Sequence, residues 1–497
     1  MSDLIDSDGT RLPIKIDSTS NGEFIPRPLD HHSQVANSLA HDWASDNAKR
    51  RGQSRRAFLM STCGVASTLT AFNHAHAALD KTGGFYDVPK EAALDAELAQ
   101  ATLESDDFIF DIQSHHLGPL EAWTEDSARY ASRRGFRFMP HGKCDYALPD
   151  AQIGHLNCYT SEAFIKEIFM DSDTDIAVLT FTPTTEEKMP LTHSEAAATR
   201  ETLNALNDGG RRLLLHGRII PNLPGDLDRM SEVHEQWGIA AWKTYTQFSP
   251  NNDTGWWLDE EYGNKLAENA RQIGVNVICV HKGLPLPSMG KENLEYGLCR
   301  DVGPAARQNP DMSYIVYHSG FDPDKKEGAF ERGNPISGID SLIESVLDSE
   351  IGLQGNVYAE LGSTWRYLLR DPDEAAHAIG KLLKYVGEDR VVWGTDSIWY
   401  GSPQDQIQAF RTFQISQAFQ EEYGYPEITP AIRAKVFGLN AAVPYGLDSD
   451  EIKSRAKVDS IGQLKQAYLE QPDPSFMTYG PKTRREFFDL MKLTGGL

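Results

Sequence analysis

Cysteine is scarce in this chain of 497 residues, which contains five, and no two of them form a Cys-x-x-Cys pair. Scattered cysteines exclude a zinc knuckle and a dense disulfide framework. We therefore expect free thiols in a core or loop. A disulfide between Cys144 and Cys158 is the alternative if the protein is exported, because disulfides persist in oxidising compartments.

The chain also lacks an excess of positive charge and any long apolar run. It has 48 Lys and Arg against 72 Asp and Glu, which gives a net charge of −24. Such an acidic chain is poorly suited to nucleic acid and to anionic membrane surfaces. No run approaches the ~20 apolar residues of a membrane-spanning helix. We expect a small-molecule substrate as partner, no nucleic acid and no stable membrane insertion, while a homo-oligomer stays open.

The amino-terminal part of the chain resembles an address for export. Residues 1–53 are polar with little periodicity, and they predict a disordered segment. Residues 54–77 begin Ser54-Arg55-Arg56-Ala57-Phe58-Leu59, continue with a mildly apolar stretch and end in Ala75-His76-Ala77. A basic region, an apolar region and a small-x-small site in this order are typical of a signal peptide, and paired arginines are typical of the twin-arginine type.

This signal predicts the twin-arginine export machinery as a partner, a periplasmic location and a mature chain that begins near Ala78. The segment ahead of the arginines is long for such a signal, so an internal or unprocessed signal is one alternative. A basic helix that happens to contain two adjacent arginines is the other.

From about Asp106 onward, eight apolar runs alternate with helical patterns. Each run predicts a buried parallel strand, because it is apolar on both faces. The predicted strands are 108–113, 176–181, 212–219, 239–245, 275–281, 313–318, 356–361 and 390–396, and the predicted helices are 194–208, 226–237, 260–273, 339–349, 373–386 and 404–420. Eight such repeats predict an α/β fold, a (β/α)₈ TIM barrel over residues 106–447. An open doubly wound sheet is the alternative.

Two segments extend beyond the simple barrel. Residues 117–174 form a long insertion after the first strand, and we expect them over the barrel mouth, where Arg133, Arg134 and His141 could meet an acidic substrate. Residues 448–497 are polar with a helical pattern, and they predict a helical carboxyl-terminal extension.

Polar side chains stand where four of the predicted strands end. The carboxyl ends of barrel strands meet at one rim, where enzymes of this fold carry their active sites. Side chains alternate along a strand, so those two residues apart share a face. The residues are Asp111, Gln113 and His115 on the first strand, His281 on the fifth, His318 on the sixth and Asp396 on the eighth. Convergence of imidazole and carboxylate groups predicts a metal-dependent enzyme.

These motifs resemble the amidohydrolase superfamily, in particular the amidohydrolase-related branch that includes aminocarboxymuconate-semialdehyde decarboxylase. The resemblance runs from about Asp106 to Leu447. It rests on the first-strand pattern, the two later histidines, the sequence Gly394-Thr395-Asp396 and the closing helix from Lys435 to Gly446.

The resemblance implies one divalent metal ion, with zinc expected and manganese as the alternative. It implies that His115, His281 and Asp396 bind the ion, that Asp396 also takes a proton from bound water, and that His318 polarises the substrate or transfers protons. An ion held this way lowers the pKa of water from ~16 to about 7.

Gln113 departs from the family pattern, which usually has two histidines on the first strand. A glutamine carbonyl is a weaker ligand than imidazole for a zinc-like ion. The ion then has fewer strong ligands, or another residue substitutes, or the metal has been lost. Glu360 and Lys243 are candidate substitutes. For Lys243 we favour contact with a substrate carboxylate or an inward salt bridge over a bridging role between metals.

Four more residues are candidates for substrate binding. Arg218 on the third strand could bind an anion, and Trp365, Arg366 and Trp399 follow the last two strands, on the mouth side. Aromatic and arginine groups there suit an aromatic or carboxylated substrate. Ordinary packing is an equally weighted alternative for these three.

The sequence thus predicts a metal-dependent hydrolase that cleaves a C–N or C–O bond of a small organic substrate through metal-activated water. A decarboxylase of an unsaturated or aromatic carboxylic acid is the alternative with the same site. A barrel that has lost catalysis and binds only a ligand is a third hypothesis, motivated by Gln113.

Overall fold

The structure is a computed structural model, and it describes residues 12–119, 122, 127, 158–206, 210–249, 254–285, 291–333 and 337–488. Arg133, Arg134, His141 and Cys144, which we singled out in the predicted insertion, lie outside these ranges.

Eight parallel strands form the centre of the molecule, in the order β2 to β9. They are β2 Phe110–Ser114, β3 Ile176–Leu179, β4 Leu213–Arg218, β5 Ala241–Tyr245, β6 Val277–His281, β7 Ser313–Tyr317, β8 Val357–Glu360 and β9 Val391–Val392. Backbone bonds from Ile112 to Trp393, from His115 to Ser397 and from Asp396 to Gln113 join the last strand to the first. The predicted TIM barrel is confirmed, and each predicted strand overlaps an observed one.

The strands form because their residues are buried on both faces. Phe110, Ile112, Val178, Cys279 and Ile315 are buried in one apolar cluster contributed by several strands. Such runs are stable only between a packed interior and a cover of helices.

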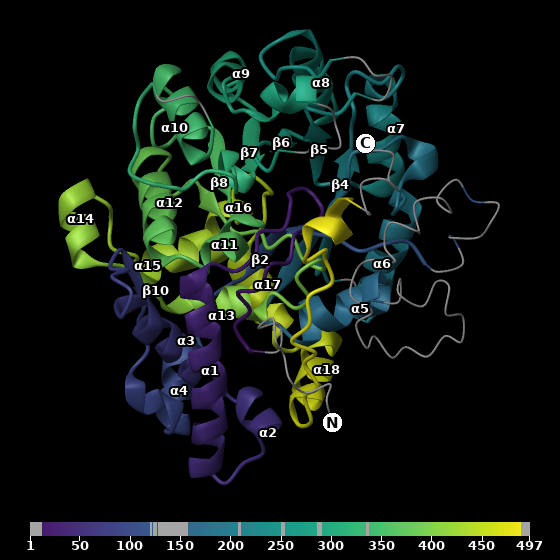
Figure 1. Cartoon of the computed structure of the whole chain (residues 1–497). Helices are drawn as coiled ribbons and strands as arrows, with labels where there is room; N and C mark the ends of the chain where they lie inside the picture. Colours follow the sequence, from purple (N-terminus) through teal and green to yellow (C-terminus); the bar gives the residue numbers. More distant parts are fainter. Residues whose placement is uncertain are drawn as a thin grey trace.

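Helices that follow the strands supply this cover (Figure 1). They are α6 His193–Ala205, α7 Met230–Trp237, α8 Glu261–Ile273, α9 Val302–Gln308, α10 Ile339–Asp348, α11 Thr364–Leu368, α12 Pro372–Tyr385 and α13 Gln404–Thr412. In the first crossover, α5 Ser161–Ile165 continues into a π-helical turn, Lys166–Met170.

The predicted helix over 404–420 is wrong at its centre. α13 ends at Thr412, Phe413–Ile415 forms the short strand β10, and α14 follows at Gln417–Tyr423. β10 pairs antiparallel with β1, Gly84–Tyr86, which lies more than 300 positions earlier. This pairing competes with helix formation, and a local pattern contains no sign of it.

The expectation of a disordered segment over residues 1–53 is wrong for the part that the structure describes. Helix α1 spans His31–Arg50, and the side chains of Leu12, Ile14 and Ile16 are completely buried. Asp30 caps α1 by accepting a hydrogen bond from the backbone N–H of Ser33. Tertiary contacts, which the polar composition does not reveal, order this segment.

The expected signal segment is built into the same body. Its residues form α2, Arg55–Leu59, and α3, Thr62–Ala77, and they are followed by α4, Ala96–Leu103. Leu69 and Phe72 of α3 are fully buried in the main apolar cluster. Figure 1 shows α1 to α4 grouped at one end of the molecule. Export through this segment stays a prediction.

The carboxyl-terminal part is helical where we expected helices. The closing region contains α15 Pro430–Ala434, a π-helical turn Lys435–Leu439 and α16 Asn440–Ala442, and the extension contains α17 Ser449–Ala456 and α18 Ser460–Leu469. The chain then returns to the barrel, where the backbone N–H of Tyr479 donates to the carbonyl of Trp399.

One of the described cysteines forms a disulfide. Cys158 is in a disulfide, whereas Cys63, Cys279 and Cys299 are free thiols, so the expectation of free cysteines is wrong for Cys158.

Among the described residues, no helix is long and apolar enough to cross a membrane.

Candidate active site

The polar residues that end the barrel strands meet at one rim. His281 is the last residue of β6, His318 follows β7, Glu360 ends β8 and Asp396 follows β9. All four are at most 2% exposed. Because β6 to β9 are parallel neighbours, their carboxyl ends bring these four residues to the same rim of the barrel.

His281 and His318 form one pair within this site. His318 Nε2 lies 3.2 Å from His281 Nδ1, and Tyr245 stacks on the His281 ring with centroids 4.7 Å apart. Burial lowers the pKa of His318 to about 4, with Lys243 acting in the same direction, although the charge of Asp396 opposes the shift. Burial, then His318 and Lys243, likewise lower the pKa of His281. Both imidazoles are therefore neutral at pH 7, as a metal ligand must be.

His115 and Asp396 form a second pair, with 3.1 Å between His115 Nε2 and Asp396 Oδ1. The other carboxylate oxygen of Asp396 accepts a hydrogen bond from Ser363 Oγ at 2.5 Å. Burial alone would raise the pKa of Asp396, but the bond and charge of His115, the charge of His318 and the Ser363 bond hold this pKa below its ordinary value. Asp396 is therefore a carboxylate at neutral pH.

A segment far outside the barrel links the two pairs. Glu23 Oε1 lies 3.6 Å from His281 Nδ1, and Glu23 Oε2 lies 3.6 Å from His318 Nε2. The Asn21 amide donates at 2.6 Å both to Glu23 Oε2 and to Asp396 Oδ2. Burial, then the charge of Asp396, raises the pKa of Glu23 to about 8, although Lys243 and Asn21 oppose this shift.

Sequence reasoning missed Asn21 and Glu23. Both lie in the polar segment that we expected to be disordered, and no local motif marks them. Only the position of the segment across the barrel reveals their role.

Backbone strain accompanies these side chains. His318, Ser363 and Asp396 have φ of +65°, +55° and +58°, in the left-handed region that non-glycine residues rarely adopt. The bond from Ser363 to Asp396 and a bond from Thr364 Oγ1 to the His318 carbonyl, at 2.9 Å, stabilise this arrangement. Strain of this kind is concentrated at functional sites.

Lys243, on β5, is completely buried beside the site. In the described part of the chain its ammonium group has no hydrogen-bond partner, and it lies 3.6 Å from the centre of the Tyr317 ring. Burial lowers its pKa to about 8, while the charges of Glu23, Glu360 and Asp396 oppose the shift. Within the described residues, Lys243 does not form the inward salt bridge that we considered.

Glu360 supports the site through backbone contacts. Its two carboxylate oxygens accept hydrogen bonds from the backbone N–H groups of His318, at 3.0 Å, and Gly362, at 2.5 Å. Burial raises its pKa to about 8. Glu360 therefore positions His318, and its role as a substitute for the weak ligand Gln113 stays a prediction.

Gln113 is on β2, and its side chain lies beside Gly362, which follows β8, and Gly394, which follows β9. A Cβ added to Gly362 would stand 2.2 Å from Gln113 Oε1, and one added to Gly394 would stand 3.1 Å from Gln113 Cβ. Among the described residues, Gln113 Oε1 has no hydrogen-bond partner although it is buried. These two glycines therefore leave the room that the Gln113 side chain occupies.

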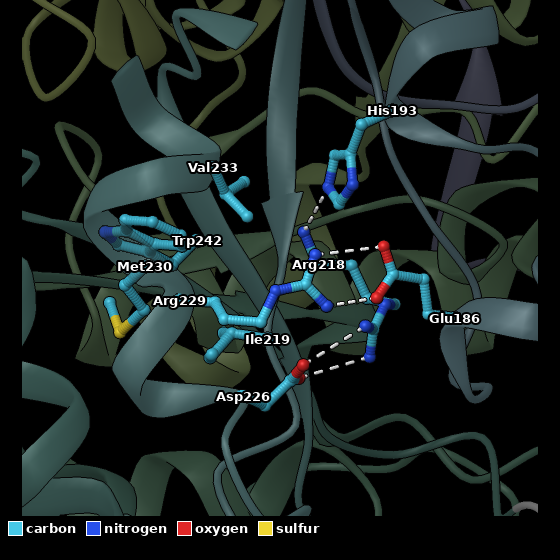
Figure 2. Close-up of a pocket in the computed structure, with 9 residues that line it drawn as sticks. All are labelled: Glu186, His193, Arg218, Ile219, Asp226, Arg229, Met230, Val233 and Trp242. Carbon is cyan, nitrogen blue, oxygen red and sulfur yellow. Dashed lines mark hydrogen bonds and ion pairs between the residues drawn. The ribbon is translucent and has the colours of Figure 1, made fainter. Parts of the chain in front are cut away.

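Arg218 lines a pocket that contains none of the rim residues described above, and its role in substrate binding stays a prediction. Its guanidinium nitrogens lie 3.2 and 3.3 Å from the carboxylate of Asp226. Figure 2 shows the pocket, in which Arg229 is paired in the same way with Glu186. His193 Nε2 accepts a bond from the backbone N–H of Arg218 at 3.1 Å.

The three candidates on the mouth-side loops have different surroundings. Trp365 is fully buried, packs edge-on against Phe410 and Phe413, and therefore belongs to the core and not to a binding surface. Arg366 is paired with Asp17 of the amino-terminal segment. Trp399 is close to the site, since its ring centroid lies 6.0 Å from that of His115.

Three residues of the site have donor atoms that fit a divalent ion, and the expected roles of His115 and Asp396 as ligands stay predictions. In the described residues, Glu23, His281 and His318 are the one group whose donor atoms all lie within 4.8 Å of one another. His115 and Asp396 are bonded to each other beside this group. Two neutral imidazoles and a carboxylate are the donor types that zinc and manganese accept.

Comparison with known proteins gives one family match. Residues 235–447 match the amidohydrolase family. No curated protein sequence matches the chain.

Three solved structures illustrate the similarity. The 5-carboxyvanillate decarboxylase of Sphingomonas paucimobilis is 13% identical, with 69% of this chain and 99% of that chain covered and a TM-score of 0.41. The dihydroxybenzoic acid decarboxylase of Polaromonas sp. JS666, with bound manganese and 2-nitroresorcinol, is 12% identical, with 69% and 97% covered and a TM-score of 0.40. The 4-oxalomesaconate hydratase of Rhodopseudomonas palustris is 13% identical, with 72% and 100% covered and a TM-score of 0.40.

Proposed function

We propose that the protein is a metal-dependent decarboxylase of a small unsaturated or aromatic carboxylic acid. The observation that carries this proposal is the buried ammonium group of Lys243. It lacks a hydrogen-bond partner within the described residues, and it interacts electrostatically with Glu23, Glu360 and Asp396. Burial of a cation without a hydrogen-bond partner costs free energy, and a substrate carboxylate would supply that partner.

The His115–Asp396 pair supplies the proton that decarboxylation requires. Loss of carbon dioxide breaks the carbon–carbon bond and leaves its electron pair on the substrate carbon, which then takes one proton. A proton shared between His115 Nε2 and Asp396 Oδ1 is positioned to make this transfer. When bound, a divalent ion would stabilise negative charge on substrate oxygens.

The remaining residues hold this arrangement in place. Ser363 and Asn21 fix the second oxygen of Asp396, and Glu360 fixes the backbone of His318. Deep burial of these groups keeps water away from the reacting carbon and strengthens each electrostatic contact.

Hydrolysis of a C–N or C–O bond is the second candidate function. Asp396 favours it, because it is ionised at neutral pH and a carboxylate can accept a proton from an attacking water. The same residues would serve both reactions, and the substrate decides between them.

The test uses the purified full chain with added zinc or manganese. Aromatic and unsaturated carboxylic acids are screened for release of carbon dioxide, and amides and lactones are screened for hydrolysis. Release of carbon dioxide without uptake of water supports the decarboxylase. Hydrolysis alone supports the second candidate, and no turnover with either panel supports the ligand-binding barrel.

We also propose that the chain is exported by the twin-arginine route and keeps its amino-terminal segment. Paired Arg55 and Arg56 ahead of an apolar stretch support the route. The disulfide at Cys158 fits an oxidising compartment. Retention is supported by the burial of Leu69 and Phe72 and by the position of Glu23 in the site.

A further inference from the structure

We propose that Glu23, from the amino-terminal segment, is a direct ligand of the divalent ion together with His281 and His318. This inference deepens the proposed function and rests on its metal dependence. It assigns the ligand position that Gln113 leaves weak to a residue 90 positions earlier in the chain, outside the barrel.

The geometry carries the proposal. Each oxygen of Glu23 lies 3.6 Å from one imidazole nitrogen, and the two nitrogens lie 3.2 Å apart. Ligand bonds of about 2.0–2.2 Å in a tetrahedral site place neighbouring donor atoms roughly 3.3–3.6 Å apart. Each oxygen of Glu23 is at such a distance from a different imidazole, and one donor atom from each of the three residues lies within 4.8 Å of the others, so the three groups are close enough to share one ion.

The segment that holds Glu23 is anchored by the residues that precede it. Lys15 is paired with Asp405, at 3.2 Å, and Asp17 is paired with Arg366. The backbone N–H of Ser20 donates to the carbonyl of Pro481. Glu23 itself is only 16% exposed. A carboxylate held this firmly loses little conformational freedom when it binds an ion.

Asn21 connects this ligand to the proton-transfer pair. Its amide donates both to Glu23 and to Asp396, so it orients the two carboxylates relative to each other. Partners of this kind commonly change metal affinity by 10- to 100-fold when they are removed.

Two other roles for Glu23 predict different results. A carboxylate that blocks the site of the substrate would compete with substrate, and its removal would increase activity without loss of metal. A purely structural carboxylate would change stability without a specific change in metal affinity.

The experiment compares the full wild-type chain with Glu23→Gln and with Glu91→Gln, an exposed control. Each protein is stripped with chelator, its folding is checked by circular dichroism, and its affinity for Zn²⁺ and Mn²⁺ is measured by titration, with stoichiometry by elemental analysis. We expect about one ion in the wild type and the control, and at least tenfold weaker binding in Glu23→Gln.

Equal affinity in Glu23→Gln and wild type overturns the inference and leaves the proposed function intact. Absence of metal binding in the wild type overturns both. A second measurement needs no variant: hydrogen exchange of residues 12–27 in the wild type should slow when Zn²⁺ is added. Unchanged exchange in that segment at saturating Zn²⁺ also overturns the inference.

Discussion

The amide of Asn21 donates a hydrogen bond of 2.6 Å to Asp396, although 375 positions separate the two residues. This bond brings the first described part of the chain into contact with the last strand of the barrel. The site therefore contains residues from outside the barrel as well as residues that follow the barrel strands.

Replacement of Asp396 by Asn should abolish turnover and leave the fold intact. The amide cannot exchange the proton with His115, and general acid–base catalysis contributes about 10²- to 10⁴-fold. The measurement is kcat of the metal-loaded variant beside its circular dichroism spectrum. Turnover at the wild-type rate would remove Asp396 from the mechanism.

Replacement of Lys243 by Met should weaken binding of a carboxylated substrate more than it slows the chemical step. A charge-assisted hydrogen bond contributes about 1.5–3 kcal/mol, so KM should rise about 10- to 100-fold. Lys188→Met, at an exposed site, is the control. The proposed contact fails if KM for the acid is unchanged while the variant remains folded.

Replacement of Glu360 by Gln should change how stability depends on pH in metal-free protein. Burial raises the pKa of Glu360 from 4.5 to about 8, so the folded state binds more protons than the unfolded state between these values. Its contribution is full below about 4.5 and is lost as pH rises through about 8.

The stability of the wild type relative to Glu360→Gln should therefore fall between pH 5 and pH 9, by on the order of 1–4 kcal/mol. Urea unfolding at several pH values measures this difference. A constant difference would show that Glu360 does not titrate over this range.

Replacement of Arg55 and Arg56 by Lys should leave the protein in the cytoplasm. The change is mild for the fold, because the pair that Arg56 makes with Asp473 is exposed and such pairs contribute little stability. Fractionation of cells, with thermal unfolding of the purified variant as control, measures the effect. Export at the wild-type level would contradict the twin-arginine prediction.

Removal of residues 1–77 should prevent stable folding. Leu12, Ile14, Ile16, Leu69 and Phe72 are completely buried, and each such side chain contributes about 1.5–3 kcal/mol. Their sum is comparable to the whole free energy of unfolding of a typical domain, about 5–15 kcal/mol. The expected result is an insoluble or unfolded product, and the mass of the native protein should include residues before Ala78. A well-folded product that begins at Ala78 would contradict this expectation.

Local patterns predicted the barrel well because a buried strand consists of a run of neighbouring apolar residues. Each run that is apolar on both faces forms a strand. The histidines at the ends of β6 and β7 lie together, as parallel neighbouring strands require. The break at Phe413–Ile415 was missed because its partner is β1, far away in the sequence.

Sequence alone determined the eight-stranded barrel, the rim at which His115, His281, His318 and Asp396 gather, and the weakness of Gln113 as a ligand. Tertiary structure alone decided that the polar amino-terminal segment lies across this rim and that Glu23 and Asn21 enter the site. The physical reason is that a strand forms from a pattern of neighbouring residues, which the sequence displays directly. The docking of an irregular segment depends instead on partners such as Arg366 and Asp405, hundreds of positions away.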